Sequence, residues 1–257
     1  MHLTAMMNLL KVIWLNTWFY TCLVLFTLVA VPILTLFVAV QAPFIPHRKA
    51  MYLFRKTIHW YGIVVIHILP FPLIRVRYQD HSHDTGPGPY LVVCNHRSSS
   101  DPFLMACLSL PEAIQIVNTW TLRLPVWGIG ARLAGYLSIN DMPVEEFFNR
   151  TSRYLSQGIS IAAFPEGTRS GSPKMGPFHG TVFRLALRDK VPIMPLCISG
   201  NEHMPPRGTM LLYPGKVTLR RLPTLTWETY KDLTPFQLKN RVHDMISREL
   251  AAMEAPQ

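Results

Sequence analysis

The distribution of apolar and polar residues divides the chain into two parts. No Asp, Glu, Lys or Arg lies between Lys11 and Arg48, and residues 14–40 within this gap are almost wholly apolar, with four aromatic rings at the start. About 20 apolar residues suffice for a helix to span a bilayer, and aromatic rings favour its interface. The run is too long for a signal peptide, and no small-residue cleavage site precedes a polar start. The pattern therefore predicts an N-terminal apolar helical membrane anchor and disfavours the alternative of a buried core helix.

Prolines shape the prediction for this segment. Pro32 would kink or break a helix, so we expect one kinked span or a shallow helical hairpin that enters one leaflet and returns. A second apolar stretch, residues 60–74, is shorter and contains Pro70 and Pro72, so it should lie on the membrane or pack under the following domain. The basic residues between the two runs should face the cytoplasm or anionic headgroups: Arg48, Lys49, Arg55 and Lys56.

From about residue 75 the pattern becomes that of an α/β protein. Short β-rich runs alternate with helical ones, which predicts a mixed sheet flanked by helices. We expect a membrane-anchoring segment over residues 1–74 and a globular domain over residues 75–257. Predicted strands cover residues 90–94, 114–117, 136–139, 159–164, 193–198 and 216–221, and predicted helices cover 102–109, 125–133, 144–156, 182–187 and 235–253.

Composition narrows the class of protein. Apolar residues make up 49% of the chain, which excludes disorder, and the four cysteines lack C-x-x-C spacing, which excludes a disulfide scaffold. Charged residues make up only 16%, where soluble domains carry about 25%, so part of the surface should face something other than water. The net charge of +10 suits nucleic acid or an anionic membrane. The chain has no nucleic-acid-binding motif, so the apolar anchor favours the membrane.

A first candidate site follows the strand predicted at residues 90–94. His96 and Asp101 stand five residues apart, with three serines between them and Pro102 after them. In the simplest interpretation Asp101 is the N-cap of a helix whose first residue is Pro102. Alternatively, the carboxylate orients His96 as a general base. A Ser-His-Asp triad is a third interpretation, disfavoured because no G-x-S-x-G elbow surrounds the serines.

A second candidate site covers residues 164–170, which read FPEGTRS after a predicted strand. Ligands in α/β proteins bind at such strand ends. Gly167 permits a tight turn, Arg169 offers a planar fork of donors for phosphate, and Glu166 can accept a hydrogen bond from a substrate hydroxyl or hold an arginine. The alternative is a surface turn with a Glu-Arg ion pair.

Taken together, the two motifs followed by Val191-Pro-Ile-Met-Pro195 make the chain resemble the glycerolipid acyltransferase family over residues 85–225. The resemblance implies a membrane-associated enzyme that moves a fatty acyl group from acyl-CoA or acyl carrier protein to a lysolipid hydroxyl, without a metal or bound cofactor. It implies His96 as the general base and Asp101 as its partner. The acceptor-binding set would be Arg97, Glu166, Gly167, Thr168 and Arg169, and Val191 and Pro192 would line the pocket near the acyl chain.

The chain departs from the family pattern at two basic positions. Asn140-Asp141 stands where Asp-Arg is expected, and His179 stands where a lysine is common. Arg150 is a candidate substitute, and a structural role is favoured for His179. Losing one bidentate phosphate contact would cost about 1.5–3 kcal/mol. An acceptor other than lysophosphatidate, such as another lysolipid or an ornithine lipid precursor, therefore stays open.

The expected function is O-acyl transfer in phospholipid synthesis at the cytoplasmic face of the inner or plasma membrane. An inactive lipid-binding relative is the alternative from another class, and the intact motif residues argue against it. His81, His83 and Asp84 are potential metal ligands, but a solvated loop is the favoured interpretation because no further ligand cluster accompanies them.

Overall fold

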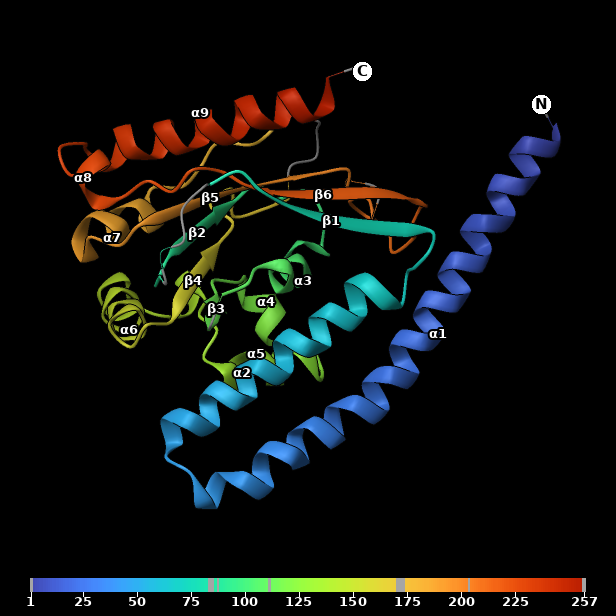
Figure 1. Ribbon diagram of the computed structural model, residues 1–257, viewed down its shortest axis with the longest axis horizontal. Helices are drawn as coiled ribbons and strands as arrows, with labels where there is room; N and C mark the ends of the chain where they lie inside the picture. Colours follow the sequence, from blue (N-terminus) through green and yellow to red (C-terminus); the bar gives the residue numbers. More distant parts are fainter. Residues whose placement is uncertain are drawn as a thin grey trace. The chain divides into compact units, whose positions relative to one another are not determined.

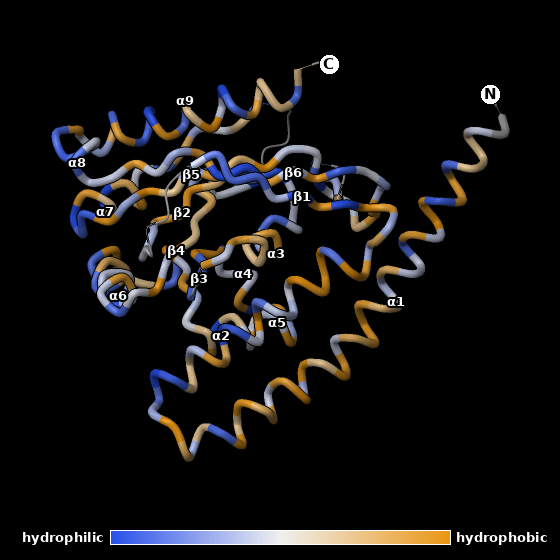
Figure 2. Tube along the Cα trace, in the orientation of Figure 1, coloured by the Kyte–Doolittle hydropathy of each residue, from blue (hydrophilic) through white to orange (hydrophobic). Residues whose placement is uncertain are grey.

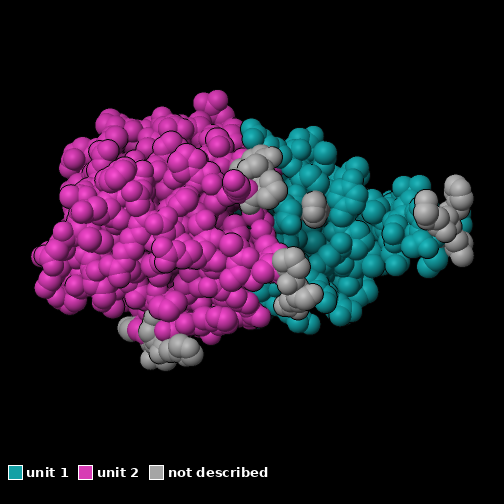
Figure 3. Space-filling model, turned by 90° about the horizontal axis from the view of Figure 1, so that it is seen from above, with its two compact units in different colours: residues 1–77, 98–108, 200–218 teal, residues 78–97, 109–199, 219–257 magenta. Residues whose placement is uncertain are grey.

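The computed structural model describes residues 2–82, 86, 88–110, 112–169, 174–202 and 204–255 (Figure 1). The chain divides into two compact units, coloured separately in Figure 3. Unit 1 comprises residues 1–77, 98–108 and 200–218, and unit 2 comprises residues 78–97, 109–199 and 219–257. The first segment of unit 1 ends near the boundary expected at residue 74. Its two later segments, 98–108 and 200–218, are distant from the first in the sequence, so local patterns do not reveal that the three belong to one unit.

Two long helices make up most of unit 1, α1 (His2–Gln41) and α2 (His47–Ile63). They pack through Phe26 and Tyr61, whose rings stack 5.2 Å apart, and through a 2.7 Å hydrogen bond between the hydroxyls of Thr27 and Tyr61. Of the two alternatives expected at Pro32, a single span and a hairpin, the structure has the single span, because α1 continues through this residue. The chain turns instead at residues 42–46, which contain two prolines and a short 3₁₀ helix.

The surface of α1 is mostly apolar. The helical stretch Thr4–Phe44, which is α1 with the short 3₁₀ helix after it, is long and apolar enough to cross a membrane, and 11% of its most apolar window is buried. Figure 2 shows the hydrophobic colouring along much of its length. Leu25, Leu28 and Leu36 are each more than half exposed. The length, composition and exposure of this helix agree with the predicted anchor.

The sheet has six strands in the order β1-β6-β5-β2-β4-β3. β2 pairs in parallel with β5 on one side and β4 on the other, and Leu225 forms an antiparallel bridge to Ile193, so the sheet is mixed as predicted. The strand predicted at 136–139 is wrong, since only Leu137 forms a bridge before a 3₁₀ turn begins at Ile139. The strands are β1 (Ile74–Asp80), β2 (Leu91–Cys94), β3 (Ala113–Gln115), β4 (Ser160–Ala163), β5 (Ile193–Ser199) and β6 (Gly215–Arg221).

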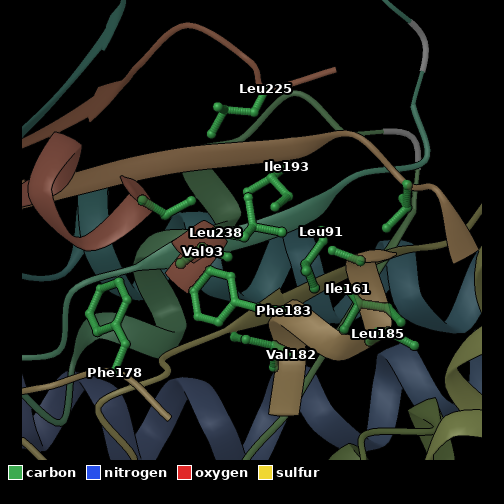
Figure 4. Close-up of a cluster of buried hydrophobic side chains, with 14 of the residues drawn as sticks. Leu91, Val93, Ile161, Phe178, Val182, Phe183, Leu185, Ile193, Leu225 and Leu238 are labelled. Atoms are coloured by element: carbon green, nitrogen blue, oxygen red, sulfur yellow. The ribbon is translucent and has the colours of Figure 1, made fainter. Parts of the chain in front are cut away.

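Buried side chains from the helices and from the sheet together form the hydrophobic core of unit 2 (Figure 4). Phe183 of α7 and Phe147 of α6 are fully buried, and α9 buries residues at intervals of four, from Leu238 to Leu250. Thr234 forms a complete capping box at the start of α9. The α-helices described in this unit are α4 (Thr119–Leu122), α5 (Trp127–Ala134), α6 (Val144–Ser156), α7 (Thr181–Asp189), α8 (Trp227–Tyr230) and α9 (Pro235–Glu254).

Candidate active site

His96 is held just beyond the carboxyl end of the central strand β2. All four residues of this strand are buried. Asn95, fully buried, extends the pairing with β5: its Nδ2 donates to the Ile198 carbonyl at 2.9 Å, and the Ile198 N–H donates to its Oδ1 at 2.7 Å. A side chain that replaces two ladder bonds lets the chain leave the strand while staying attached to the sheet. Asn95 therefore anchors the peptide that carries His96, a role that sequence analysis missed.

Glu166 joins the two sequence motifs, although they are about 70 residues apart. Its Oε1 accepts the His96 N–H at 2.7 Å, and its Oε2 accepts the Gly176 N–H at 2.7 Å. The side chain is 6% exposed. The His96 ring also lies 4.8 Å from the ring of Phe164, which follows β4. Hydrogen bonds to a charged acceptor are strong, so the carboxylate braces both backbone segments.

The turn after Glu166 has a left-handed backbone at Gly167, with φ of 70°. A Cβ here would come within 3.1 Å of the His179 ring, so the position favours glycine for two reasons. The His179 N–H donates to the Pro165 carbonyl at 2.7 Å, and its side chain is exposed. Thr168 is exposed and Arg169 partly exposed, which suits side chains that meet a substrate, while Ser170 lies outside the described residues.

Asp101 is fully buried in unit 1 at the start of α3 (Asp101–Leu104). The helix begins at Asp101 itself, with Ser100 as N-cap residue, so the expected Asp101 N-cap is wrong. The carboxylate points backwards instead, and its Oδ2 accepts the Ser98 N–H at 3.0 Å. Its Oδ1 accepts a hydrogen bond from Nδ2 of the fully buried Asn201. Asn201 lies 100 residues away, so no sequence signal connected the two.

Arg97 lies between His96 and Asp101 in the chain and is 4% exposed. Its guanidinium forms an ion pair with Glu254 at the end of α9, and Ser199 Oγ donates to the same carboxylate at 3.2 Å. The structure thus gives Arg97 an internal partner in unit 2, and its predicted contact with substrate stays a prediction. The covalent link between His96 in unit 2 and Asp101 in unit 1 runs through this residue.

Val191 and Pro192 lie at the other end of the strands from His96. β5 runs parallel to β2 and starts opposite Leu91, and Pro192 accepts the Leu91 N–H at 3.0 Å. The length of β2 alone separates the two ends by about 13 Å. The Val191 carbonyl accepts the Tyr230 hydroxyl, and burial raises the pKa of this phenol above its usual range. The structure therefore does not bring this pair to the His96 end of the sheet.

The remaining sequence candidates have partners of their own. Asp141 accepts the Thr119 hydroxyl at 2.8 Å, and Arg150, the candidate substitute for a family arginine, is exposed and pairs with Glu146 at 2.6 Å. Among the described residues no group of three or more His, Cys, Asp and Glu side chains is placed to hold a metal ion. His83 and Asp84 lie outside that described part.

Comparisons with known proteins identify the family of this region. A family model described as Acyltransferase matches residues 74–199, a range that contains both motifs. This region belongs to the acyltransferase family. The acyltransferase region therefore covers β1 to β5, and both the predicted family and the predicted enzyme class are confirmed.

Individual relatives match over most of the chain. A 1-acyl-sn-glycerol-3-phosphate acyltransferase of Limnanthes alba is 23% identical over 76% of this chain and 78% of its own length. The alpha form of Ovis aries is 28% identical over 72% of this chain and 66% of its own. The crystal structure of the 1-acyl-sn-glycerophosphate acyltransferase PlsC from Thermotoga maritima has 21% identity and a TM-score of 0.75, and 98% of each chain is covered. The last likeness shows that the fold is shared along nearly the whole chain.

Proposed function

We propose that the protein transfers a fatty acyl group from a thioester, acyl-CoA or acyl carrier protein, to the free hydroxyl of a lysophospholipid such as 1-acylglycerol-3-phosphate. The observation that carries the proposal is the bond between Glu166 and the His96 backbone, because it unites the two family motifs at one end of the sheet. The names of the relatives in plants and mammals support the acceptor class.

His96 acts in this proposal as the general base. Its imidazole removes the proton of the acceptor hydroxyl as the oxygen attacks the thioester carbonyl, the C–S bond breaks, and the thiol leaves with a proton. A thioester is already activated, so no covalent enzyme intermediate is required. Asp101 is the carboxylate that fixes the tautomer and stabilises the imidazolium, as its position in the motif implies.

Thr168 and Arg169 are proposed to meet the acceptor. Both follow the braced Glu166 and reach solvent to different degrees, and a guanidinium fits the oxygens of a phosphate. The exposed imidazole of His179 lies against the same turn. We infer that the apolar helix α1 holds the enzyme at a membrane. The active domain would then lie at the cytoplasmic face, where its acyl donors occur.

An acceptor panel tests the proposal. Purified full-length protein is given labelled acyl-CoA, or acyl carrier protein, with lysophosphatidate, lysophosphatidylcholine, lysophosphatidylglycerol or an ornithine lipid precursor. We expect lysophosphatidate to be converted to phosphatidic acid. Acylation of only another acceptor would keep the chemistry and remove the phosphate monoester as substrate. Failure with every acceptor and both donors would favour a lipid-binding relative without activity.

A further inference from the structure

An exposed apolar hairpin in unit 2 takes no part in the chemistry described above. It consists of α4, α5 and the turn between them, here called the α4–α5 hairpin, residues 119–134 (Figure 1). Trp120 is 54% exposed, Ile129 50% and Leu133 59%. Single exposed apolar residues are ordinary, but a contiguous group of large ones marks an interaction surface.

The exposed side chains share one side of α5. Ile129 and Leu133 are four residues apart, so they lie one above the other on the same helix face. Gly128 and Ala134 are buried, and a Cβ at Gly128 would meet the Leu122 carbonyl oxygen at 2.6 Å. The helix thus approaches α4 closely at Gly128, while its large apolar side chains Ile129 and Leu133 are exposed.

The turn before α5 has a strained backbone. Val126 has φ of 63° and ψ of −69°, a conformation that β-branched residues avoid, and the Trp127 N–H donates to the Pro125 carbonyl at 2.7 Å. This tight turn leaves the apolar side chain of Val126 40% exposed. A non-aqueous partner that covers this turn would relieve the exposure of the Val126 side chain to water, whereas the backbone strain is local and would remain.

The charged side chains of the hairpin itself are all basic, and the carboxylate of Asp141 lies at its start, where it accepts the Thr119 hydroxyl. Between residues 113 and 140 the charged side chains are Arg123 and Arg132, both exposed. Neither side chain forms an ion pair within the described part of the chain. Arginines beside tryptophan and aliphatic side chains are the composition of a surface that lies in the headgroup region of an anionic bilayer.

We propose that the α4–α5 hairpin docks on the anionic surface of a lipid bilayer. Trp120, Ile129 and Leu133 enter the boundary between headgroups and acyl chains, and Arg123 and Arg132 meet lipid phosphates. This contact belongs to the unit that carries His96 and is distinct from the apolar helix α1. Its function is to hold that unit at the lipid surface from which an acceptor enters.

Photo-crosslinking in the full-length protein tests the docking directly. The photoreactive residue p-benzoylphenylalanine replaces Trp120, Ile129 or Leu133 one at a time, in vesicles of phosphatidylcholine with phosphatidylglycerol. Phe236 is the matched control, because it is 66% exposed and stands on α9 of the same unit beside Lys239. We expect at least about fivefold more lipid adduct at the hairpin positions, and less in vesicles of phosphatidylcholine alone. Lipid adducts at the level of the control, or adducts to a second copy of the chain, would overturn the proposal.

Kinetics give a second measurement. The double change Trp120→Ser with Leu133→Ser should raise KM for an acceptor embedded in vesicles by about tenfold or more. The kcat with a short-chain, water-soluble acceptor should stay at the wild-type value, because neither residue lies at the site. Equal KM values in vesicles would contradict the docking. If the wild type transfers no acyl group, the proposed function fails while the crosslinking experiment still decides this proposal.

Discussion

Replacing Glu166 by glutamine distinguishes two roles for this carboxylate. The sequence predicts an acceptor-binding residue, whereas the structure shows both oxygens accepting backbone N–H groups, from His96 and Gly176. A glutamine keeps one acceptor oxygen and places an NH₂ group, which cannot accept, against the other N–H. A hydrogen bond to a charged group contributes about 1.5–3 kcal/mol. Because this bond orients His96, its loss should raise the activation free energy of acyl transfer by an amount in this range.

This energy translates into a rate. At about 1.4 kcal/mol per tenfold, Glu166→Gln should lower kcat by roughly 10- to 150-fold. The KM for the lysolipid should change little, because the side chain acts on the peptide of His96 and not on the substrate. Steady-state acyl transfer with lysophosphatidate measures both parameters, and thermal unfolding of the same samples measures stability.

A matched control separates this effect from general loss of charge. Glu228→Gln removes an exposed carboxylate of the same unit, whose partner is Lys231 at 2.6 Å. Such surface pairs contribute between zero and about 1 kcal/mol, so kcat should be unchanged. A Glu166→Gln enzyme with unaltered kcat and a raised KM would refute the bracing role and restore the prediction from the sequence.

Three further substitutions probe the supports of the site. Asn201→Leu removes the donor to buried Asp101 and should lower the free energy of unfolding by about 1.5–3 kcal/mol in urea titrations; an unchanged midpoint would show that this bond contributes nothing. Glu254→Gln replaces the carboxylate that pairs with the buried guanidinium of Arg97 by a neutral amide, and because Glu254 is 32% exposed we expect a loss of about 1–3 kcal/mol by calorimetry, smaller than for a fully buried pair. Gly167→Ala forces a Cβ into a left-handed turn, and circular dichroism melts should show a lower Tm.

Local patterns in the sequence predicted much of the fold. The helix Val144–Ser156 matches the predicted range, because its apolar spacing and flanking Pro143 and Gly158 are local signals. Strand β2 was recognisable as a buried apolar run. Pro32 left two alternatives, a kinked span and a hairpin, and the structure has one helix that continues through this residue. Patterns within a few residues therefore located the elements, and the proline alone did not decide between the two alternatives.

The chemistry of the site was predictable in its residue types and less so in its contacts. His96 and Glu166 were both singled out, but their hydrogen bond depends on the pairing of β2 with β4, which no local pattern specifies. The same holds for Asn201, which belongs to no motif and reaches Asp101 only through the association of segments 98–108 and 200–218. Val191 and Pro192 were assigned by resemblance, and the strand register shows them at the opposite end of the sheet.

The central claim is that His96 removes the proton in acyl transfer to a lysolipid hydroxyl. The most direct measurement is the transfer of labelled acyl groups to lysophosphatidate by wild-type and His96→Ala proteins in the same membranes. The account predicts that the wild type forms phosphatidic acid, and that the variant folds with a similar Tm and forms none above the uncatalysed rate. Turnover by the folded variant comparable to that of the wild type would contradict it.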